Sequence, residues 1–374
     1  MPRFHLPDVA DLLRLGEPRE YAITIYAETA PGPDQRDTGH VTAKSAFDRA
    51  IRELREHGVP PDVEQRLRLQ WQQISESELW LQLSRSLAIF IADDFHEVYV
   101  LPNALVTASQ VGTYFDIGQL MRAVTTPQEA FALTLSGNGW NLWRATATTR
   151  AEELPLVGEH PVDVADATNR ATVRDRDHVR RLVGDEGKKL LLETYAKRVA
   201  DAVAAELGRI DPAAKTPLFV FATEPLLGLF RGLEHRYDTV PVPGAPDELR
   251  PDQIDDAIRT SLAEVNAART SAVADKAGDG VARGLAATDL ADIGRAAVAG
   301  AVSTLIYDFT GDVLGHLDDG TGQVTLDDGG YDLVSRIALT VLDKGGDVIA
   351  VRPGEVDADI WNGTALASLR YALT

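Results

Sequence analysis

The sequence feature that most constrains the fold is a β-hairpin pattern followed by a long irregular insert. Apolar residues recur along residues 131–144 on both sides of Asn138-Gly139. Both residue types tolerate the positive φ of a tight primed turn, so we predict a hairpin that turns at this pair. The insert runs from about Val157 to Gly187, and an apolar stripe predicts an amphipathic helix at about 188–207 after it.

Helices and strands alternate on both sides of this middle region. Predicted strands lie at 21–26, 86–92, 97–101, 217–223, 302–308, 348–352 and 367–372, and predicted helices at 44–57, 61–83, 252–275, 290–300 and 331–342. A loop rich in Pro and Gly is expected at 30–39. With 374 residues, this pattern predicts an α/β protein of three domains at 1–126, 127–250 and 251–374, the last an α/β/α sandwich.

The charge is unevenly distributed along the chain. The formal net charge is −20, yet residues 169–198 contain nine Lys or Arg and five acids, a balance of +4. An acidic surface repels nucleic acid at long range, which disfavours free DNA or RNA as the sole partner. The basic stretch is either a solvated helix face with ion pairs or an electropositive tip on an acidic body.

The order of these features resembles that of class-1 peptide-chain release factors of archaea and eukaryotes. The stretches that carry the resemblance are Ala132–Leu154, Leu218–Thr223 and Ala274–Asp308. The chain looks like one of the bacterial relatives of these factors. The resemblance implies a ribonuclease-H-like middle domain and a last domain like kink-turn-binding ribosomal proteins.

The chain departs from the family at the residues that carry its chemistry. In release factors the insert holds a Gly-Gly-Gln tripeptide whose glycines let the backbone approach the reaction centre closely. Here residues 157–187 contain no glutamine, and Gly322-Gln323 lies far away in the last region. The first region shows no recognisable stop-codon-reading tetrapeptide. Neither hydrolysis nor decoding is therefore carried over, and no catalytic residue is assigned.

Other chemistry finds little support. The segment Gly184–Lys189 lacks the first Gly and the final Ser or Thr of a phosphate-binding loop. The chain has no cysteine, no His-Glu-x-x-His pattern and no apolar run of about 18 residues, so we expect no metal, cofactor or membrane span. Asp318-Asp319 and Asp327-Asp328 fit turns at the ends of a strand better than a calcium site. Trp140 and Trp143 should point to opposite sheet faces, so at least one could be exposed for stacking on RNA.

Three functions stay open at this point. The first is a non-catalytic, cytoplasmic ribosome-associated factor in hibernation or quality control. Its basic insert would enter a cavity lined by rRNA, and its last domain would contact the ribosomal stalk base or a partner protein. Its rRNA-binding candidates are Arg170, Arg174, Arg176, Arg180, Arg181, Lys188 and Lys189. The second is a protein-interaction or regulatory module that no longer binds ribosomes, which the net charge favours. The third is a peptidyl-tRNA hydrolase whose non-standard loop positions water through Asp175, Asp177 or Asp185.

Overall fold

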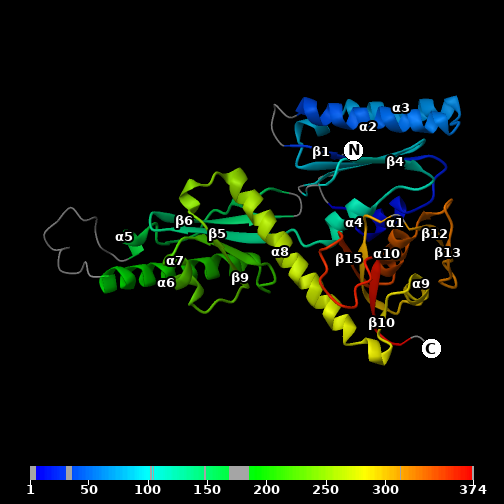
Figure 1. Ribbon diagram of the computed structural model, residues 1–374. Coiled ribbons are helices and arrows are strands. Elements are labelled where there is room, and N and C mark those ends of the chain that lie inside the picture. Colours follow the sequence, from blue (N-terminus) through cyan, green and yellow to red (C-terminus); the bar gives the residue numbers. More distant parts are fainter. Residues whose placement is uncertain are drawn as a thin grey trace. The chain divides into compact units, whose positions relative to one another are not determined.

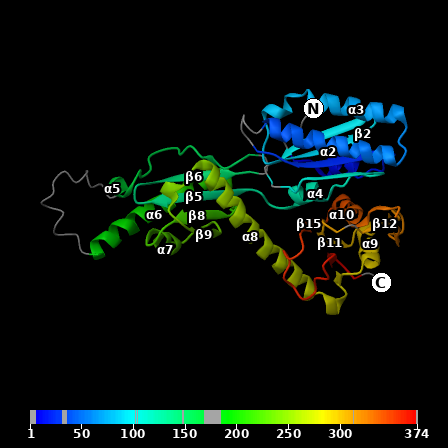
Figure 2. The same cartoon turned by 45° about the horizontal axis from the view of Figure 1, so that its top comes forward.

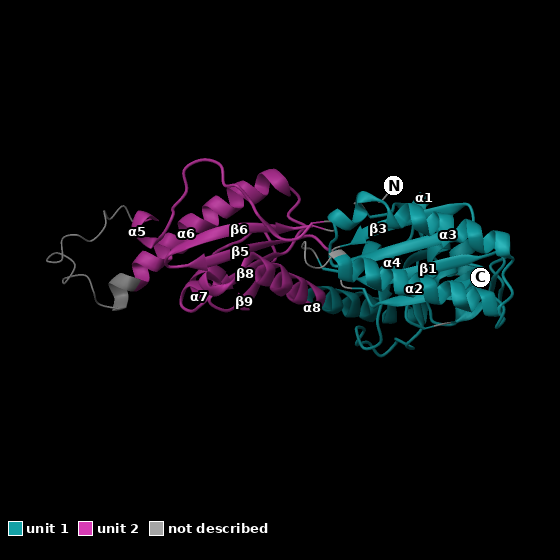
Figure 3. Ribbon diagram, turned by 90° about the horizontal axis from the view of Figure 1, so that it is seen from above, with its two compact units in different colours: residues 1–127, 265–374 teal, residues 128–264 magenta. Residues whose placement is uncertain are grey.

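The computed structural model describes residues 6–30, 36–101, 103, 105–146, 149–167, 185–311 and 313–372. The chain is mixed α/β with several sheets, as predicted, and it divides into two compact units (Figures 1 and 3). Unit 1 combines Met1–Pro127 with Val265–Thr374, and unit 2 is Gln128–Glu264. The division into three domains stays a prediction, because the segments before and after unit 2 lie in one unit.

The N-terminal segment of unit 1 is an antiparallel sheet with helices on it. Its elements are α1 (Val9–Leu15), β1 (Ala22–Glu28), α2 (Arg36–Glu56), α3 (Pro61–Ser75), the 3₁₀ helix η2 (Glu78–Leu81), β2 (Ser86–Ala92), β3 (Phe95–Leu101), β4 (Ala108–Gly112) and α4 (Gly118–Thr125). The strand order is β3-β2-β1-β4. Figures 1 and 2 show α2 and α3 side by side over one face, where Ile23 and Ile25 share a buried cluster with Phe47 and Trp71.

Two boundaries in this segment differ from the sequence prediction. Helix α2 begins at Arg36, within the range expected to be a loop (30–39), so Gly39 lies inside the helix. A Cβ on Gly39 would come within 3.1 Å of the side chains of Leu83 and Thr29, so glycine serves close packing rather than a loop. Helix α3 ends at Ser75, and the indole N–H of Trp80 then donates to the Ile74 carbonyl at 3.1 Å.

The C-terminal segment of unit 1 is three-layered. Its elements are α8 (Pro251–Gly278, which starts in unit 2), η5 (Val281–Arg283), β10 (Ala286–Ala287), α9 (Leu290–Val298), β11 (Val302–Asp308), β12 (Leu314–Leu317), β13 (Val324–Leu326), β14 (Tyr331–Asp332), α10 (Leu333–Asp343), β15 (Asp347–Val351) and β16 (Ala365–Leu369). The main sheet has the order β10-β16-β11-β15, with β11 and β15 parallel. Helices α9 and α10 cover one face, while Ala274 and Ala277 of α8 pack against Ile306 and Leu366 on the other.

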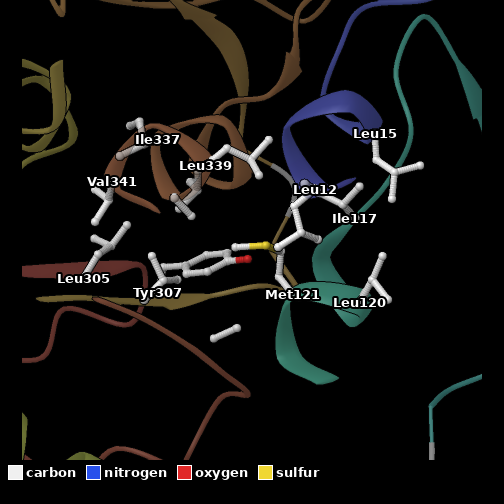
Figure 4. Packing of buried hydrophobic residues seen from close by; sticks show 14 of the residues in the cluster. Leu12, Leu15, Ile117, Leu120, Met121, Leu305, Tyr307, Ile337, Leu339 and Val341 are labelled. Carbon is white, nitrogen blue, oxygen red and sulfur yellow. The ribbon is translucent and has the colours of Figure 1, made fainter. Parts of the chain in front are cut away.

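The two segments of unit 1 share one hydrophobic core. Leu12 and Leu15 of α1 and Met121 of α4 lie in the same buried cluster as Tyr307 of β11 and Ile337 of α10 (Figure 4). The cluster also takes Tyr26, Phe90 and Tyr99 from the face of the N-terminal sheet opposite α2 and α3. Burial of apolar surface on both faces of that sheet therefore ties residues far apart in sequence into one body.

Unit 2 is a mixed sheet that packs against helices. Its elements are β5 (Ala130–Ser136), β6 (Gly139–Ala145), β7 (Glu152–Glu153), α5 (Val164–Ala167), α6 (Asp185–Ile210), β8 (Leu218–Ala222), α7 (Leu226–Arg231), β9 (Thr239–Pro243) and the 3₁₀ helix η4 (Pro246–Glu248). The strand order is β7-β6-β5-β8-β9, with β6 antiparallel to its neighbours and β8 and β9 parallel to β5. Strand β8 is buried along its whole length, as its uniformly apolar sequence predicts.

The predicted hairpin is present, but its turn differs in position and type. Ser136 pairs with Gly139, so the turn residues are Gly137 and Asn138. None of Gly137, Asn138 and Gly139 has a positive φ. The Ser136 hydroxyl accepts a hydrogen bond from the Asn138 backbone N–H at 3.1 Å. The Asn138 side chain donates to Asp247 at 3.1 Å. Side-chain hydrogen bonds thus stabilise a turn that needs no left-handed residue, which the Asn-Gly signal alone could not reveal.

Candidate functional site

The insert of unit 2 leaves the sheet beside the hairpin turn. The Val164 backbone N–H donates to the Gly137 carbonyl at 3.4 Å, which ties the start of α5 to that turn. The Asp166 carboxylate accepts from the Val162 N–H at 3.0 Å, and the Asp163 carboxylate accepts from the Asp166 N–H at 2.8 Å. These acidic side chains satisfy backbone donors at and just before the start of the short helix.

Helix α6 packs beneath this point and completes the base of the insert. Ala167 of α5 and Tyr195 of α6 are both buried in the core cluster of unit 2. Among the described residues, the Tyr195 hydroxyl has no hydrogen-bond partner. Burial raises the pKa of this hydroxyl, and the carboxylates of Asp163 and Asp247 raise it further, so Tyr195 is neutral at physiological pH. It acts as a packing residue at the insert base.

Trp140 and Trp143 are both buried, which corrects the expectation that at least one is exposed. The two residues are 6% and 8% exposed. The Trp140 indole N–H donates to the Pro161 carbonyl at 2.6 Å, and the ring meets His160 edge-on at 5.7 Å between centroids. The Trp143 indole N–H donates to the Thr134 hydroxyl at 3.0 Å. Trp140 therefore holds the insert against the sheet, and neither ring is available to stack on RNA.

Of the predicted rRNA-binding residues, Lys189 is the one whose side chain can be placed. The five arginines, at 170, 174, 176, 180 and 181, lie outside the described residues, and so does the side chain of Lys188. The Lys189 side chain is 68% exposed, and its ammonium lies 3.9 Å from the Glu193 carboxylate one turn later. For Lys189 this arrangement fits a solvated helix face, and the rRNA contact stays a prediction.

The carboxylates considered for water positioning cannot be located either. Asp175 and Asp177 lie outside the described residues, and Asp185 is the first residue of α6 with its side chain outside them. What the structure does place at the insert base is apolar surface, because Val157, Val162 and Leu190 are each more than 60% exposed. The sequence analysis did not single out these three exposed aliphatic residues.

The aspartate pairs of the C-terminal segment form turns, as predicted. Asp318 accepts hydrogen bonds from the backbone N–H groups of Gly320 and Thr321 at the end of β12, and Asp327 accepts one from Gly329 after β13. These bonds lower the pKa of the Asp318 carboxyl, together with one from the Thr321 hydroxyl. Within the described part of the chain, no group of three or more His, Asp or Glu residues is placed to hold a metal ion.

Unit 1 contains a cavity of about 270 Å³ that the sequence did not indicate. It is lined from both segments, by residues around β4 and α4 and by residues that follow β11 and β15. None of the helices in the described ranges is long and apolar enough to cross a bilayer.

Comparison with known proteins relates unit 2 to a family of translation factors. A family model described as bacterial archaeo-eukaryotic release factor family 11 matches residues 127–268. The resemblance to release factors is therefore confirmed over the middle of the chain, and the match begins and ends within a few residues of unit 2. No curated protein matches the sequence.

Solved structures of translation factors are similar to the chain at low sequence identity. Archaeal Pelota, from a model of ribosome-bound Pelota and ABCE1, is 13% identical over 99% of this chain and 96% of that chain, with a TM-score of 0.41. The S. cerevisiae translation termination-like factor Dom34 is 10% identical over 80% of this chain and 77% of that chain, with a TM-score of 0.35. The archaeal termination factor aRF1 is 13% identical over 98% and 99% of the two chains, with a TM-score of 0.24. These scores are too low to establish a common overall arrangement.

Proposed function

We propose, from the relationship of residues 127–268 to bacterial archaeo-eukaryotic release factors, that this chain is a release-factor-like, ribosome-associated translation factor. The observation that carries the proposal is the coincidence of the family match with unit 2, the unit from which the insert departs. Its partners are then rRNA and ribosomal proteins, and its place is the cytoplasm. Hibernation or quality control is the role that we assign.

The fold of each segment supports the proposal at a finer level. Numbered within unit 2, the strands have the order 3-2-1-4-5 with strand 2 antiparallel, which is the arrangement of a ribonuclease-H-like sheet. We therefore take unit 2 as the ribonuclease-H-like middle domain. The three layers around β11 support an α/β/α domain like the kink-turn-binding ribosomal proteins, with residues 1–126 as a third domain.

The mechanism that we infer is occupancy without hydrolysis. Residues 157–187 hold no glutamine, so the insert lacks the tripeptide that release factors bring to the peptidyl-transferase centre. It carries instead five arginines between 170 and 181. Guanidinium groups bind phosphate in a bidentate manner, so these side chains suit an rRNA-lined cavity. An insert that fills this cavity blocks it without any chemical step.

Ribosome association is tested by sedimentation. Tagged protein from starved host cells is expected in the 70S or 50S fractions of a sucrose gradient. A variant with the five insert arginines changed to Gln should leave these fractions. The matched control changes five exposed arginines of α2 and α3 (49, 52, 55, 66 and 68), which alters the net charge equally. Absence of the wild-type protein from ribosomal fractions, or equal loss in both variants, contradicts the proposal.

The salt dependence of binding to purified ribosomes adds a quantitative test. Removal of one arginine–phosphate interaction should reduce the slope of log affinity against log salt by up to about 0.9. The insert variant is therefore expected to show a shallower slope than the control variant. Release of peptide from peptidyl-tRNA on stalled ribosomes by the wild-type protein would instead favour the hydrolase with a non-standard loop.

A protein-interaction module is the second candidate, and two observations favour it. The net charge of −20 disfavours approach to rRNA, and Val157, Val162 and Leu190 expose apolar surface at the insert base. A pull-down that returns one protein and no rRNA, and that fails with Val157→Ser and Val162→Ser, would select this function.

A further inference from the structure

The small sheet of the C-terminal segment ends in an open strand edge. Its order is β13-β12-β14, so β13 has a neighbouring strand on one side only. Strands β12 and β13 lie beside α9 and α10 (Figure 1). A Cβ on Gly294 of α9 would lie 2.8 Å from the Val324 side chain, so one face of β13 packs closely on that helix. Thr325 and Leu326 remain exposed, which leaves the outer edge of β13 accessible within unit 1.

The hydrogen bonds on either side of β13 show which way its backbone groups point. The Asp318 N–H donates to the Gln323 carbonyl at 2.9 Å, and the Asp327 N–H donates to the Leu314 carbonyl at 3.2 Å. Thr325 lies midway between these two bonds in the register of β12 and β13. Hydrogen-bonded pairs recur at every second residue of an antiparallel ladder. Thr325 therefore directs its N–H and C=O groups toward β12.

Val324 and Leu326 consequently direct their N–H and C=O groups away from β12. Within the described part of the chain, no hydrogen bond reaches these four groups. An edge strand with unpaired backbone groups is a template for pairing with another strand, and Pro or Lys commonly protects such edges. The sequence of β13, Val-Thr-Leu, contains neither. The edge is therefore suited to strand addition, in which main-chain hydrogen bonds supply the affinity.

The charge around β13 selects the kind of strand that can bind. Asp318 and Asp319 precede the strand, and Asp327 and Asp328 follow it. They carry a formal charge of −4, and Arg336, which pairs with Asp319 at 3.1 Å, offsets one of these charges. A second copy of the chain would bring the same aspartates to the edge, so repulsion disfavours pairing between two copies. A segment with Lys or Arg on both sides of its apolar residues is favoured instead.

We propose that the outer edge of β13 binds an extended basic segment of another protein by strand addition. The backbone of the segment pairs with the outward groups of Val324 and Leu326. One of its apolar side chains covers Leu326, which is 68% exposed, and its flanking Lys or Arg side chains lie near the aspartates. The inference stands apart from the binding of rRNA, because it uses one small sheet of unit 1 alone.

Fluorescence polarisation with the full-length protein tests this proposal on labelled synthetic peptides. The probe is Lys-Val-Thr-Val-Thr-Val-Lys with blocked ends, and we expect saturable binding at low salt below about 1 mM. A peptide with Glu in place of both Lys should bind at least about tenfold more weakly. N-methylation of the three central residues removes backbone donors at unchanged charge and should also weaken binding at least about tenfold. No saturable binding of the probe, or equal binding of either altered peptide, would overturn the proposal.

Variants then locate the site on β13. Leu326→Pro removes an outward N–H but no bond to β12, and should weaken binding of the probe at least about tenfold. Asp328→Asn should weaken it about threefold, whereas the control Glu56→Gln, at an exposed site of α2, should leave it unchanged. Unchanged affinity in Leu326→Pro contradicts the assignment, and so does a wild-type dimer in sedimentation velocity that this variant abolishes. The peptide comparisons do not depend on any variant folding.

Discussion

Unit 2 is built from one continuous stretch of chain, whereas unit 1 joins two stretches on either side of it. In unit 2 the core forms between strands and helices of one continuous stretch, such as β5, β6 and α6. In unit 1 a large core lies where α1, α4 and the N-terminal sheet meet β11 and α10. One chain therefore contains a unit whose core forms within a single stretch of sequence and a unit whose core joins two distant segments. We call the boundary between those two segments of unit 1 the seam.

The largest expected effect comes from a substitution that leaves an empty space in the core at the seam. Met121 is fully buried and belongs to the same cluster as Tyr307. Met121→Ala should lower the free energy of unfolding of unit 1 by about 3–5 kcal/mol. Hydrogen exchange should show that β1, β2, β11 and α10 lose protection together while unit 2 keeps its own. Leu133→Ala, at a fully buried site of β5, is the matched control and should affect unit 2 alone. Loss confined to the N-terminal segment in Met121→Ala would contradict a shared core.

A polar contact across the seam should have the next largest effect. Arg122 of α4 donates to the Ala350 carbonyl at 2.6 Å and pairs with Glu355 at 3.0 Å. Burial lowers the pKa of this guanidinium, and Glu355 acts in the opposite direction. Arg122→Met removes a donor to the Ala350 carbonyl and the cation beside the Glu355 carboxylate, so we expect a loss of about 2–3 kcal/mol by urea denaturation. Arg295→Met, at an exposed site, should change the free energy of unfolding by less than about 0.5 kcal/mol. Equal losses in the two variants would contradict a stabilising role for the Arg122 contact.

Close backbone approach across the seam gives a smaller effect. A Cβ on Gly118 would lie 2.8 Å from the Phe309 carbonyl oxygen, and backbone cannot yield as a side chain can. Gly118→Ala should therefore destabilise unit 1 by about 1–2 kcal/mol, measured by thermal unfolding. Gly137→Ala in the unit 2 turn is the comparison, because nothing lies within 4 Å of its Cβ position. A neutral Gly118→Ala would mean that the two segments can separate slightly at this point.

The smallest effect concerns an ion-pair cluster away from the seam. Hydrogen bonds from Arg55 and Arg68 lower the pKa of the Glu64 carboxyl to about 2, against an ordinary value of 4.5. A depressed carboxyl pKa stabilises the fold above the unfolded value and loses that effect as pH falls from about 4.5 toward 2. Glu64→Gln should thus cost less than about 1 kcal/mol at pH 7, and the difference from wild type should vanish near pH 2. A difference that does not change with pH would exclude this origin.

Local patterns predicted much of unit 2 and of the individual elements. The hairpin, the buried strand β8 and the long helix α6 all follow from apolar periodicity within short windows. The turn at Gly137 and Asn138 did not follow, because the Ser136 hydroxyl decides it. Periodicity placed Trp140 and Trp143 on opposite faces but could not show that both faces are covered.

The seam and the cavity could not be predicted because they depend on contacts between distant segments. One signal was present in β1, where Ala22 to Ala27 are buried without alternation. Such a run indicates a strand buried on both faces, but it does not show which segment of the chain packs on the second face. The cavity gathers Gln110, Asp116, Asp332 and Arg352 from separate loops and ends of elements, and no spacing along the chain relates them. The basic insert, in turn, remains a sequence-level prediction for most of its residues.

The placement of β11 and α10 after unit 2 has a consequence for biosynthesis. When the first 127 residues emerge from the ribosome, the sheet face that bears Tyr26, Phe90 and Tyr99 still lacks its cover. Unit 2 is complete by residue 264 and can fold in the meantime, since domains fold as units during synthesis. The nascent N-terminal segment therefore keeps an uncovered apolar face until β11 and α10 have been translated.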